Sequence, residues 1–112
     1  MRIAVWAAAL AFSATLAVSG GESRADEPIV ITIKNHKFTP AEVKVPAGKR
    51  VELTVVNDDP TPEEFESKTM KVEKVIPGKS KATVRIGPLD KGRYNFFGEF
   101  NEATAQGFVV VD

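Results

Sequence analysis

The chain contains no cysteine among its 112 residues. Without thiols it cannot form a disulfide, a thiolate zinc site, an iron–sulfur cluster or a cysteine nucleophile. The sequence also has a single histidine, His36, and only two methionines. Nitrogen and sulfur ligands for a metal ion are therefore scarce, whereas carboxylates are plentiful.

An excess of charge of either sign is also lacking, since 15 Lys and Arg residues balance 15 Asp and Glu residues. Nucleic-acid binding needs a concentrated positive patch, and no such patch is apparent. Hydrolase chemistry is equally unsupported, because Ser67 and Ser80 have no second histidine to serve them. Gly78-Lys79-Ser80 lacks the upstream glycine of a phosphate-binding loop and is typical of a turn between strands.

Residues 1–25 have the pattern of a secretory signal peptide. Met1-Arg2 gives a positive start, Ile3 to Val18 is almost wholly apolar, and Ser23-Arg24-Ala25 places small residues at a cleavage site. The apolar run is shorter than the roughly 20 residues of a spanning helix, although an uncleaved anchor is the alternative. We expect cleavage before Asp26, one domain over 26–112, no stable membrane insertion afterwards, and a periplasmic location.

Apolar and polar residues alternate with a period of two after residue 26, which indicates half-buried β-strands. Ile29, Ile31 and Ile33 alternate with Val30, Thr32 and Lys34, and similar runs recur around 43–45, 51–55, 84–86, 94–96 and 109–111. Residues 66–75 fit either a helical turn or a strand. Short strands separated by Pro, Gly and Asn turns predict an all-β sandwich of two sheets that share one core.

Two segments resemble the cupredoxin fold. FTPAEVKVPAGKRVELTVVN, residues 38–57, is similar to its opening, in which a Phe-x-Pro and a Pro-Ala-Gly turn lead to a strand that ends in Asn. GPLDKGRYNFFGEFNEATAQG, residues 87–107, is similar to its closing half, in which a glycine turn precedes an aromatic strand. The resemblance implies a cupredoxin-like Greek-key β-sandwich of about seven to eight strands.

The ligands of blue-copper members of that family are absent from this chain. By resemblance, the cysteine position falls on Gly98, the second histidine on Asn101 and the methionine near Gln106. The earlier histidine falls at or next to Glu64. Glycine offers no donor atom and neutral amides are poor copper ligands, so a thiolate–imidazole site of the blue type is excluded.

The chain resembles more closely the small periplasmic cupredoxin-like proteins related to the cupredoxin domain of EfeO-type iron-uptake proteins. The matching stretches are NHKFTP, NDDPTPEEFES, MKVEKVIPG and FFGEFNEATAQG, although such relatives commonly carry histidine at the position of Asn101. This resemblance implies a role in ferrous iron uptake, with an inner-membrane iron permease or an associated periplasmic protein as partner. It further implies copper-assisted iron oxidation or metal delivery to the permease, with copper as cofactor and iron as substrate or alternative metal.

Six residues are the candidate metal ligands. His36 is the one strong nitrogen donor, Met70 is a soft thioether, and the carboxylates lie in the two segments that a cupredoxin fold brings together. The full set is His36, Glu64, Glu66, Met70, Glu73 and Glu99. Imidazole and carboxylate suit oxidised copper and methionine suits reduced copper, while an oxygen-rich site also accepts iron or manganese.

Each candidate also has a purely structural interpretation. His36 fits a surface residue, Met70 fits a core residue, and the glutamates fit exposed partners of Lys68, Lys71 and Lys74. Glu63, which follows Pro62, fits a solvated charge. Whether the chain is a ferroxidase component therefore stays open beside two other functions. One is a carrier that binds and hands over copper or iron, and the other is a metal-free periplasmic interaction module on a cupredoxin scaffold.

Overall fold

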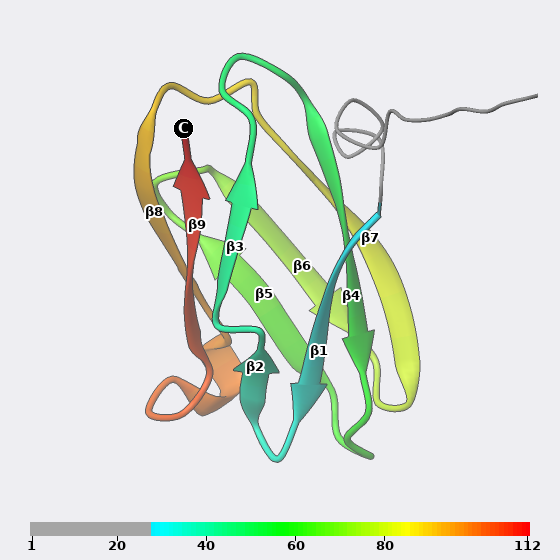
Figure 1. The fold of residues 1–112 in the computed structure, drawn as a ribbon. Coiled ribbons are helices and arrows are strands. Elements are labelled where there is room, and N and C mark those ends of the chain that lie inside the picture. The colour runs from blue at the N-terminus through cyan, green and yellow to red at the C-terminus, as the bar shows by residue number, and fades with distance from the viewer. Residues whose placement is uncertain (1–27) are drawn as a thin grey trace, which may run out of the picture.

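The computed structural model describes residues 28–112, which form nine strands and one 3₁₀ turn (Figure 1). The strands are β1 (Ile29–Lys34), β2 (Lys37–Thr39), β3 (Glu42–Val45), β4 (Val51–Asn57), β5 (Glu63–Ser67), β6 (Val72–Ile76), β7 (Ser80–Ile86), β8 (Gly92–Phe97) and β9 (Gln106–Val111). The 3₁₀ turn η2 (Glu99–Asn101) lies between β8 and β9. The signal peptide expected at residues 1–25 lies outside the described residues. Within the described part, no helix is long and apolar enough to cross a membrane.

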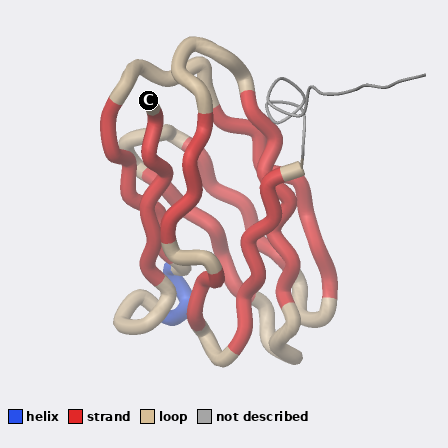
Figure 2. Tube along the Cα trace, in the orientation of Figure 1, coloured by secondary structure: helices blue, strands red, loops and turns tan. Residues whose placement is uncertain are grey.

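The strands form two sheets, and most loops gather at the two ends of the domain (Figure 2). One sheet has the order β2-β1-β4-β7 and the other has the order β3-β9-β8-β5-β6. β1 runs parallel to β4 and β3 runs parallel to β9, whereas the other pairs are antiparallel. The predicted all-β sandwich is confirmed, with one strand more than the upper number expected.

The core lies between the two sheets and follows the alternation of the sequence. Ile31, Ile33, Leu53 and Val55 are fully buried on the first sheet, and Phe65, Phe96 and Val109 are fully buried on the second. Phe65 stacks on Phe96 with ring centroids 4.6 Å apart, and Phe38 meets both rings edge-on. Burial of each such side chain contributes roughly 1.5–3 kcal/mol, which explains how a domain without disulfides holds together.

The short strand β2 has no clear signal in the sequence, because it depends on the turn before it. Asn35 and His36 adopt φ values of 55° and 59°, the left-handed region that few side chains favour. The Asp59 carboxylate accepts the backbone N–H groups of both residues, at 2.8 and 2.9 Å. This contact over more than twenty residues of sequence stabilises the turn and lets β2 fold back on β1.

Strand β5 is also hidden in the sequence, since its residues EEFES contain a single apolar side chain. Phe65 faces the core, and the alternation of strand side chains directs Glu63 and Ser67 to the same side. Glu64 and Glu66 consequently face away from the other sheet. The ambiguous segment 66–75 is resolved as the end of β5, a turn, and most of β6.

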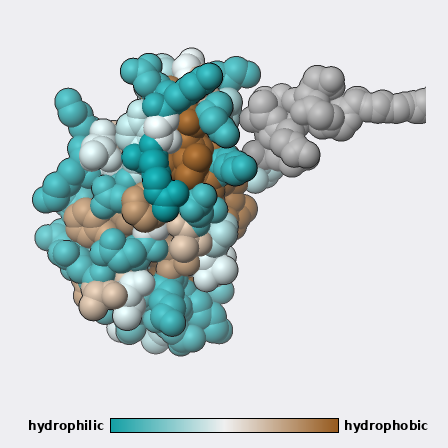
Figure 3. All heavy atoms as spheres, turned by 60° about the vertical axis from the view of Figure 1, so that its left-hand side comes forward, coloured by the Kyte–Doolittle hydropathy of each residue, from teal (hydrophilic) through white to brown (hydrophobic). Residues whose placement is uncertain are grey.

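The outer surface is mostly polar. Figure 3 shows one side of the molecule, where hydrophilic residues cover most of the area and hydrophobic surface is limited. The large exposed hydrophobic side chains of the described residues are Val30, Val75 and Phe100. Val75 and Phe100 lie beside the candidate metal centre that is described next.

Candidate metal centre

Strands β5 and β6 and the turn η2 bring four of the six candidate ligands together at the second sheet. Glu66 of β5 lies directly opposite Glu73 of β6, and on its other side it pairs with Phe97 of β8. Glu64 lies two residues before Glu66 on β5, so strand alternation places it on the same face as Glu66 and Glu73. Glu99 belongs to η2, beyond the end of β8, and its carboxylate meets the other three there.

The four carboxylates, here called the glutamate cluster, are close enough to share one ion. Ligand oxygens of Glu64, Glu66, Glu73 and Glu99 all lie within 4.8 Å of one another. Oxygens on opposite sides of a calcium-sized ion are separated by about 4.6–5.2 Å, and those of a smaller ion by about 4 Å. The observed spacing fits a single divalent cation.

Glu64 is the unusual member of the glutamate cluster. Its side chain is buried, with 2% of the residue exposed, and its Oε1 has no hydrogen-bond partner among the described residues. Burial, followed by hydrogen bonding and charge from Glu73 and Glu99, raises the pKa of the Glu64 carboxyl from 4.5 to about 8. A buried carboxylate without a donor is unfavourable. The raised pKa means that the cation-free carboxyl retains a proton at neutral pH, and a bound cation would displace this proton and give Oε1 a partner.

The donor set of the glutamate cluster is purely carboxylate. Such oxygens suit magnesium, calcium and manganese, and an oxygen-rich site also accepts ferrous iron. A hollow of about 210 Å³ lies beside the cluster and is lined by Glu66, Ser67, Lys68, Lys71, Val72 and Glu73. Glu73 and Glu99 are exposed, so an ion could reach the cluster from solvent without a rearrangement of the sheet.

His36 lies away from the glutamate cluster, and Met70 packs against the hydrophobic core. His36 lies in the β1–β2 turn of the opposite sheet, where its Nδ1 is 3.6 Å from Asp59 Oδ2. Met70 lies in the β5–β6 turn and packs against the hydrophobic core, with its N–H donated to Ser67 Oγ. The left-handed turn at residue 36 and the apolar character of the thioether explain these two positions.

The position implied for the blue-copper ligands is filled by a protein carboxylate. Glu63 is 1% exposed, and its Oε1 accepts the N–H groups of Glu64 and Phe100 at 2.9 and 3.1 Å. Its Oε2 accepts Asn101 Nδ2 at 2.5 Å. A Cβ added to Gly98 would lie 2.7 Å from this carboxylate. A carboxylate whose two oxygens both accept hydrogen bonds from the protein, an amide and a glycine do not fit copper, so the fold family's usual metal is not accommodated there.

Sequence reasoning misses the roles of Glu63 and Asn101. The position of Glu63 after Pro62 suggests a solvated charge, whereas the structure buries this residue. The sequence does contain a signal for these roles. Glycine stands at the position implied for the copper-binding cysteine, residue 98, and an amide stands at the position implied for the histidine, residue 101. An acidic residue begins β5.

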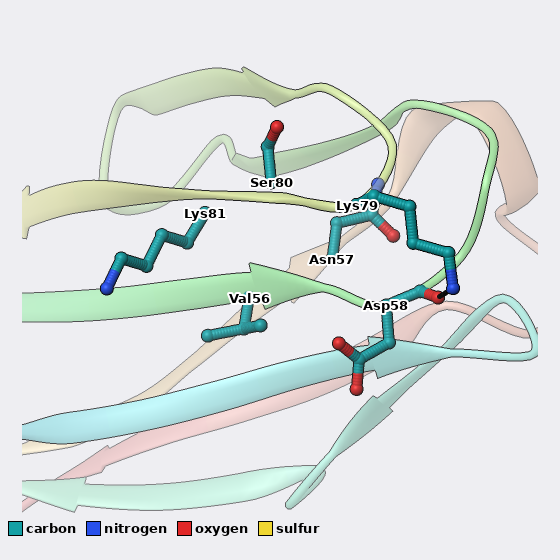
Figure 4. Close-up of a pocket in the computed structure, with 6 residues that line it drawn as sticks. All are labelled: Val56, Asn57, Asp58, Lys79, Ser80 and Lys81. Atoms are coloured by element: carbon teal, nitrogen blue, oxygen red, sulfur yellow. Dashed lines mark hydrogen bonds between the residues drawn. The ribbon is translucent and has the colours of Figure 1, made fainter.

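A second hollow lies between the end of β4 and the start of β7 (Figure 4). Its volume is about 320 Å³, and it is lined by Val56, Asn57, Asp58, Lys79, Ser80 and Lys81. Lys79 Nζ donates to the backbone carbonyl of Asp58 at 2.6 Å. Lys79 and Lys81 make this hollow cationic, and none of the candidate ligands lines it.

Comparisons with known proteins place the chain by sequence. The model of a family described as "Cupredoxin-like domain" matches residues 2–111. An uncharacterized protein of Rickettsia prowazekii (strain Madrid E) is 39% identical over 97 residues, which cover 84% of this chain and 78% of that protein. This relative carries no functional description that could be compared with the glutamate cluster.

Comparisons with solved structures place the chain by fold. The metal binding domain of the Cu(I) exporting P-type ATPase CopA of Streptococcus pneumoniae D39, with Cu(I), has a TM-score of 0.68 and 20% identity over 76% of this chain and 84% of that one. Amicyanin from Paracoccus versutus has a TM-score of 0.59 and 19% identity over 77% of this chain and 82% of that one. At such identities these two structures show a shared fold. Because the family model spans nearly the whole chain and the structure is the matching two-sheet sandwich, the chain belongs to the cupredoxin-like domain family.

Proposed function

We propose that this chain is a periplasmic metal-binding protein that takes ferrous iron, or a similar divalent cation, in the glutamate cluster and delivers it to an inner-membrane iron permease. The observation that carries the proposal is the buried Oε1 of Glu64, which lacks a partner inside a group of four carboxylates. A structural interpretation of these residues as exposed ion pairs leaves that oxygen unexplained.

Charge supports a cation as the ligand. The salt bridges of the described residues are His36–Asp59, Arg85–Glu52 and Arg93–Glu42, and none involves a member of the glutamate cluster. Like charges held this close repel one another, so a cation that neutralises them gains more here than at a single exposed acid.

Delivery is favoured over copper-assisted oxidation of iron. An oxidation centre would need copper ligands beside the iron, and of the two candidates His36 lies in the opposite sheet while Met70 packs against the core. The exposed Glu73 and Glu99 leave one side of the cluster open, which suits an ion that must be released to a partner. The iron-uptake context and the permease rest on the resemblance to EfeO-type proteins.

Calorimetric titration of residues 26–112 with Mn²⁺, and with Fe²⁺ under anaerobic conditions, tests the proposal. We expect one cation per chain, and Glu64→Gln should weaken affinity by at least about tenfold. Glu102→Gln makes the same charge change in the loop after η2, outside the cluster, and should leave affinity within about twofold. His36→Ala should also leave it unchanged.

A metal-free interaction module is the second candidate, and exposed hydrophobic side chains favour it. Val75 lies opposite Glu64 on β6 and is 51% exposed, while Phe100 follows Glu99 and is 52% exposed. These side chains could contact a partner at the rim of the cluster. If the titration releases no heat and the cations do not raise the melting temperature of the protein, this second function is supported and the cation proposal is contradicted.

A further inference from the structure

Glu63 lies at the junction between the two segments that supply the glutamate cluster. It immediately precedes Glu64 in β5, and the residues it contacts, Phe100 and Asn101, immediately follow Glu99 in η2. It points to the core side of the sheet, whereas the cluster lies on the outer side, so Glu63 cannot itself join the cluster.

Three donors engage both oxygens of the Glu63 carboxylate. Backbone N–H groups of Glu64 and Phe100 share Oε1, and the Asn101 amide holds Oε2. Charge-assisted hydrogen bonds of this kind are stronger than neutral ones, and burial increases their strength. One side chain thereby ties the backbone at position 64 to the backbone at position 100.

The register between β5 and β8 is limited to the pair Glu66 and Phe97, so the backbone ladder alone leaves the region of Glu99 weakly attached. The Glu63 contacts extend this attachment beyond the last residue of β8. The absence of a side chain at Gly98 gives the carboxylate the space it occupies, since a Cβ there would be 2.7 Å from Glu63 Cδ.

We propose that Glu63 is a positioning residue for the cation site, which holds Glu64 and Glu99 at ligand distance by tying β5 to η2. This inference rests on the proposed function. In this role Glu63 neither binds the cation nor faces solvent; it keeps β5 and η2 at a fixed separation.

The test compares Mn²⁺ affinity of residues 26–112 with that of two variants of Glu63. Glu63→Ala removes the acceptor for all three donors and should weaken Mn²⁺ binding by at least about tenfold. Glu63→Gln keeps one oxygen for the two N–H groups, and a rotated Asn101 amide can accept from its NH₂. The Mn²⁺ affinity of this variant should be within about threefold of that of the wild-type protein.

Two results on these variants would overturn the proposal. Equal loss in Glu63→Gln and Glu63→Ala would mean that Glu63 acts through its charge. Retained affinity in Glu63→Ala would mean that the link is dispensable. If the unchanged chain binds no Mn²⁺, the proposed function fails instead, which is a distinct outcome.

A control for stability uses Val84→Ala, a core substitution in the opposite sheet. It should lower the melting temperature without lowering Mn²⁺ affinity when measured well below that temperature. An affinity loss equal to that of Glu63→Ala would show that Glu63 merely supports folding, and would refute the positioning role.

Amide hydrogen exchange of the cation-free protein gives a readout independent of metal. The Phe100 and Glu64 amides should exchange at least about tenfold faster in Glu63→Ala than in Glu63→Gln. If Glu63→Ala does not fold, Asn101→Ala removes one donor, and it should still accelerate exchange at Phe100 and weaken Mn²⁺ binding severalfold. Unchanged exchange in the folded variant would contradict the proposal.

Discussion

At the scale of single residues, Glu64 makes the cation-free protein sensitive to pH. Its carboxyl has a pKa of about 8 in the folded chain against 4.5 for an ordinary glutamate, because burial and the neighbouring Glu73 and Glu99 disfavour the charged form. Between these values the folded protein retains a proton that the unfolded chain has released. The contribution of Glu64 to the free energy of unfolding is therefore fully present below about pH 4.5 and is lost as pH rises through about 8.

Glu64→Gln should remove this decline. The amide carries no charge at any pH, so the variant should be more stable than the unchanged protein at about pH 8 to 9 in the presence of a chelator. Urea unfolding at a series of pH values measures the difference. A decline of the same steepness in both proteins would show that another group is responsible.

Asp59 contributes stability with the opposite pH dependence. Its hydrogen bond from the His36 N–H is the main cause that lowers the pKa of its carboxyl below 3.8, with the Asn35 N–H adding to the effect and burial opposing it. The folded chain thus keeps Asp59 ionised to lower pH than the unfolded chain does. This contribution is present above about pH 3.8 and is lost as pH falls through the lowered pKa.

Asp59→Ala should lower the free energy of unfolding by about 2 kcal/mol at neutral pH, since two N–H groups of the β1–β2 turn lose a charged acceptor. Asp58→Ala is the matched control, because Asp58 is exposed and its carboxylate accepts neither of these two N–H groups. Chemical denaturation of both variants checks the prediction. Equal losses would mean that Asp59 has no special role in the turn.

At the scale of elements, β8 and η2 depend on the glycine at position 98. Gly98 has φ −99° and ψ 113°, a conformation open to any residue, so the need for glycine is steric. An added Cβ would lie 2.7 Å from Glu63 Oε1 and 2.9 Å from the Ala105 Cβ. Gly98→Ala should therefore destabilise the protein by about 1–3 kcal/mol.

A double-mutant cycle identifies the cause of that loss. In a Glu63→Ala background the carboxylate is gone, and adding Gly98→Ala should be markedly less harmful than it is in the unchanged protein. Urea unfolding of the four proteins measures the coupling. Additive losses would place the clash at Ala105 alone.

The sequence predicts elements well where one face of a strand is apolar. Ile31 and Ile33 in β1, and Leu53 and Val55 in β4, produce the alternation that makes the sandwich predictable. β2 and β5 lack this signal, because β2 depends on the distant Asp59 and β5 carries glutamates on both faces. The grouping of Glu64 with Glu99 depends on how η2 folds back against β5, a long-range contact that no local pattern in a single sequence encodes.

A single sequence also could not show which of the six candidate ligands point toward one another. Segment proximity in the fold suggests His36 and Met70 together with the glutamates, but proximity of segments does not determine the direction of side chains. The left-handed turn keeps His36 at Asp59, and Met70 packs against the core. Metal ligation by the four glutamates stays a prediction until an ion is measured there.

At the scale of the whole molecule, the glutamate cluster and the position that the resemblance implies for copper are two different places on the domain. The end of the sandwich where the resemblance places copper is filled by Glu63, Gly98 and Asn101. The glutamate cluster lies on the opposite face of the same strands. A fold shared with copper proteins therefore does not by itself identify the metal or the place where it binds.

NMR line broadening by substoichiometric Mn²⁺ on isotopically labelled residues 26–112 tests the central claim most directly. A manganese ion in the glutamate cluster would broaden the amide signals of residues 64–66, 73 and 98–100 first, while signals around His36 in the opposite sheet would broaden less. Broadening centred on His36 and Asp59, or none at stoichiometric Mn²⁺, would contradict a cation site formed by Glu64, Glu66, Glu73 and Glu99.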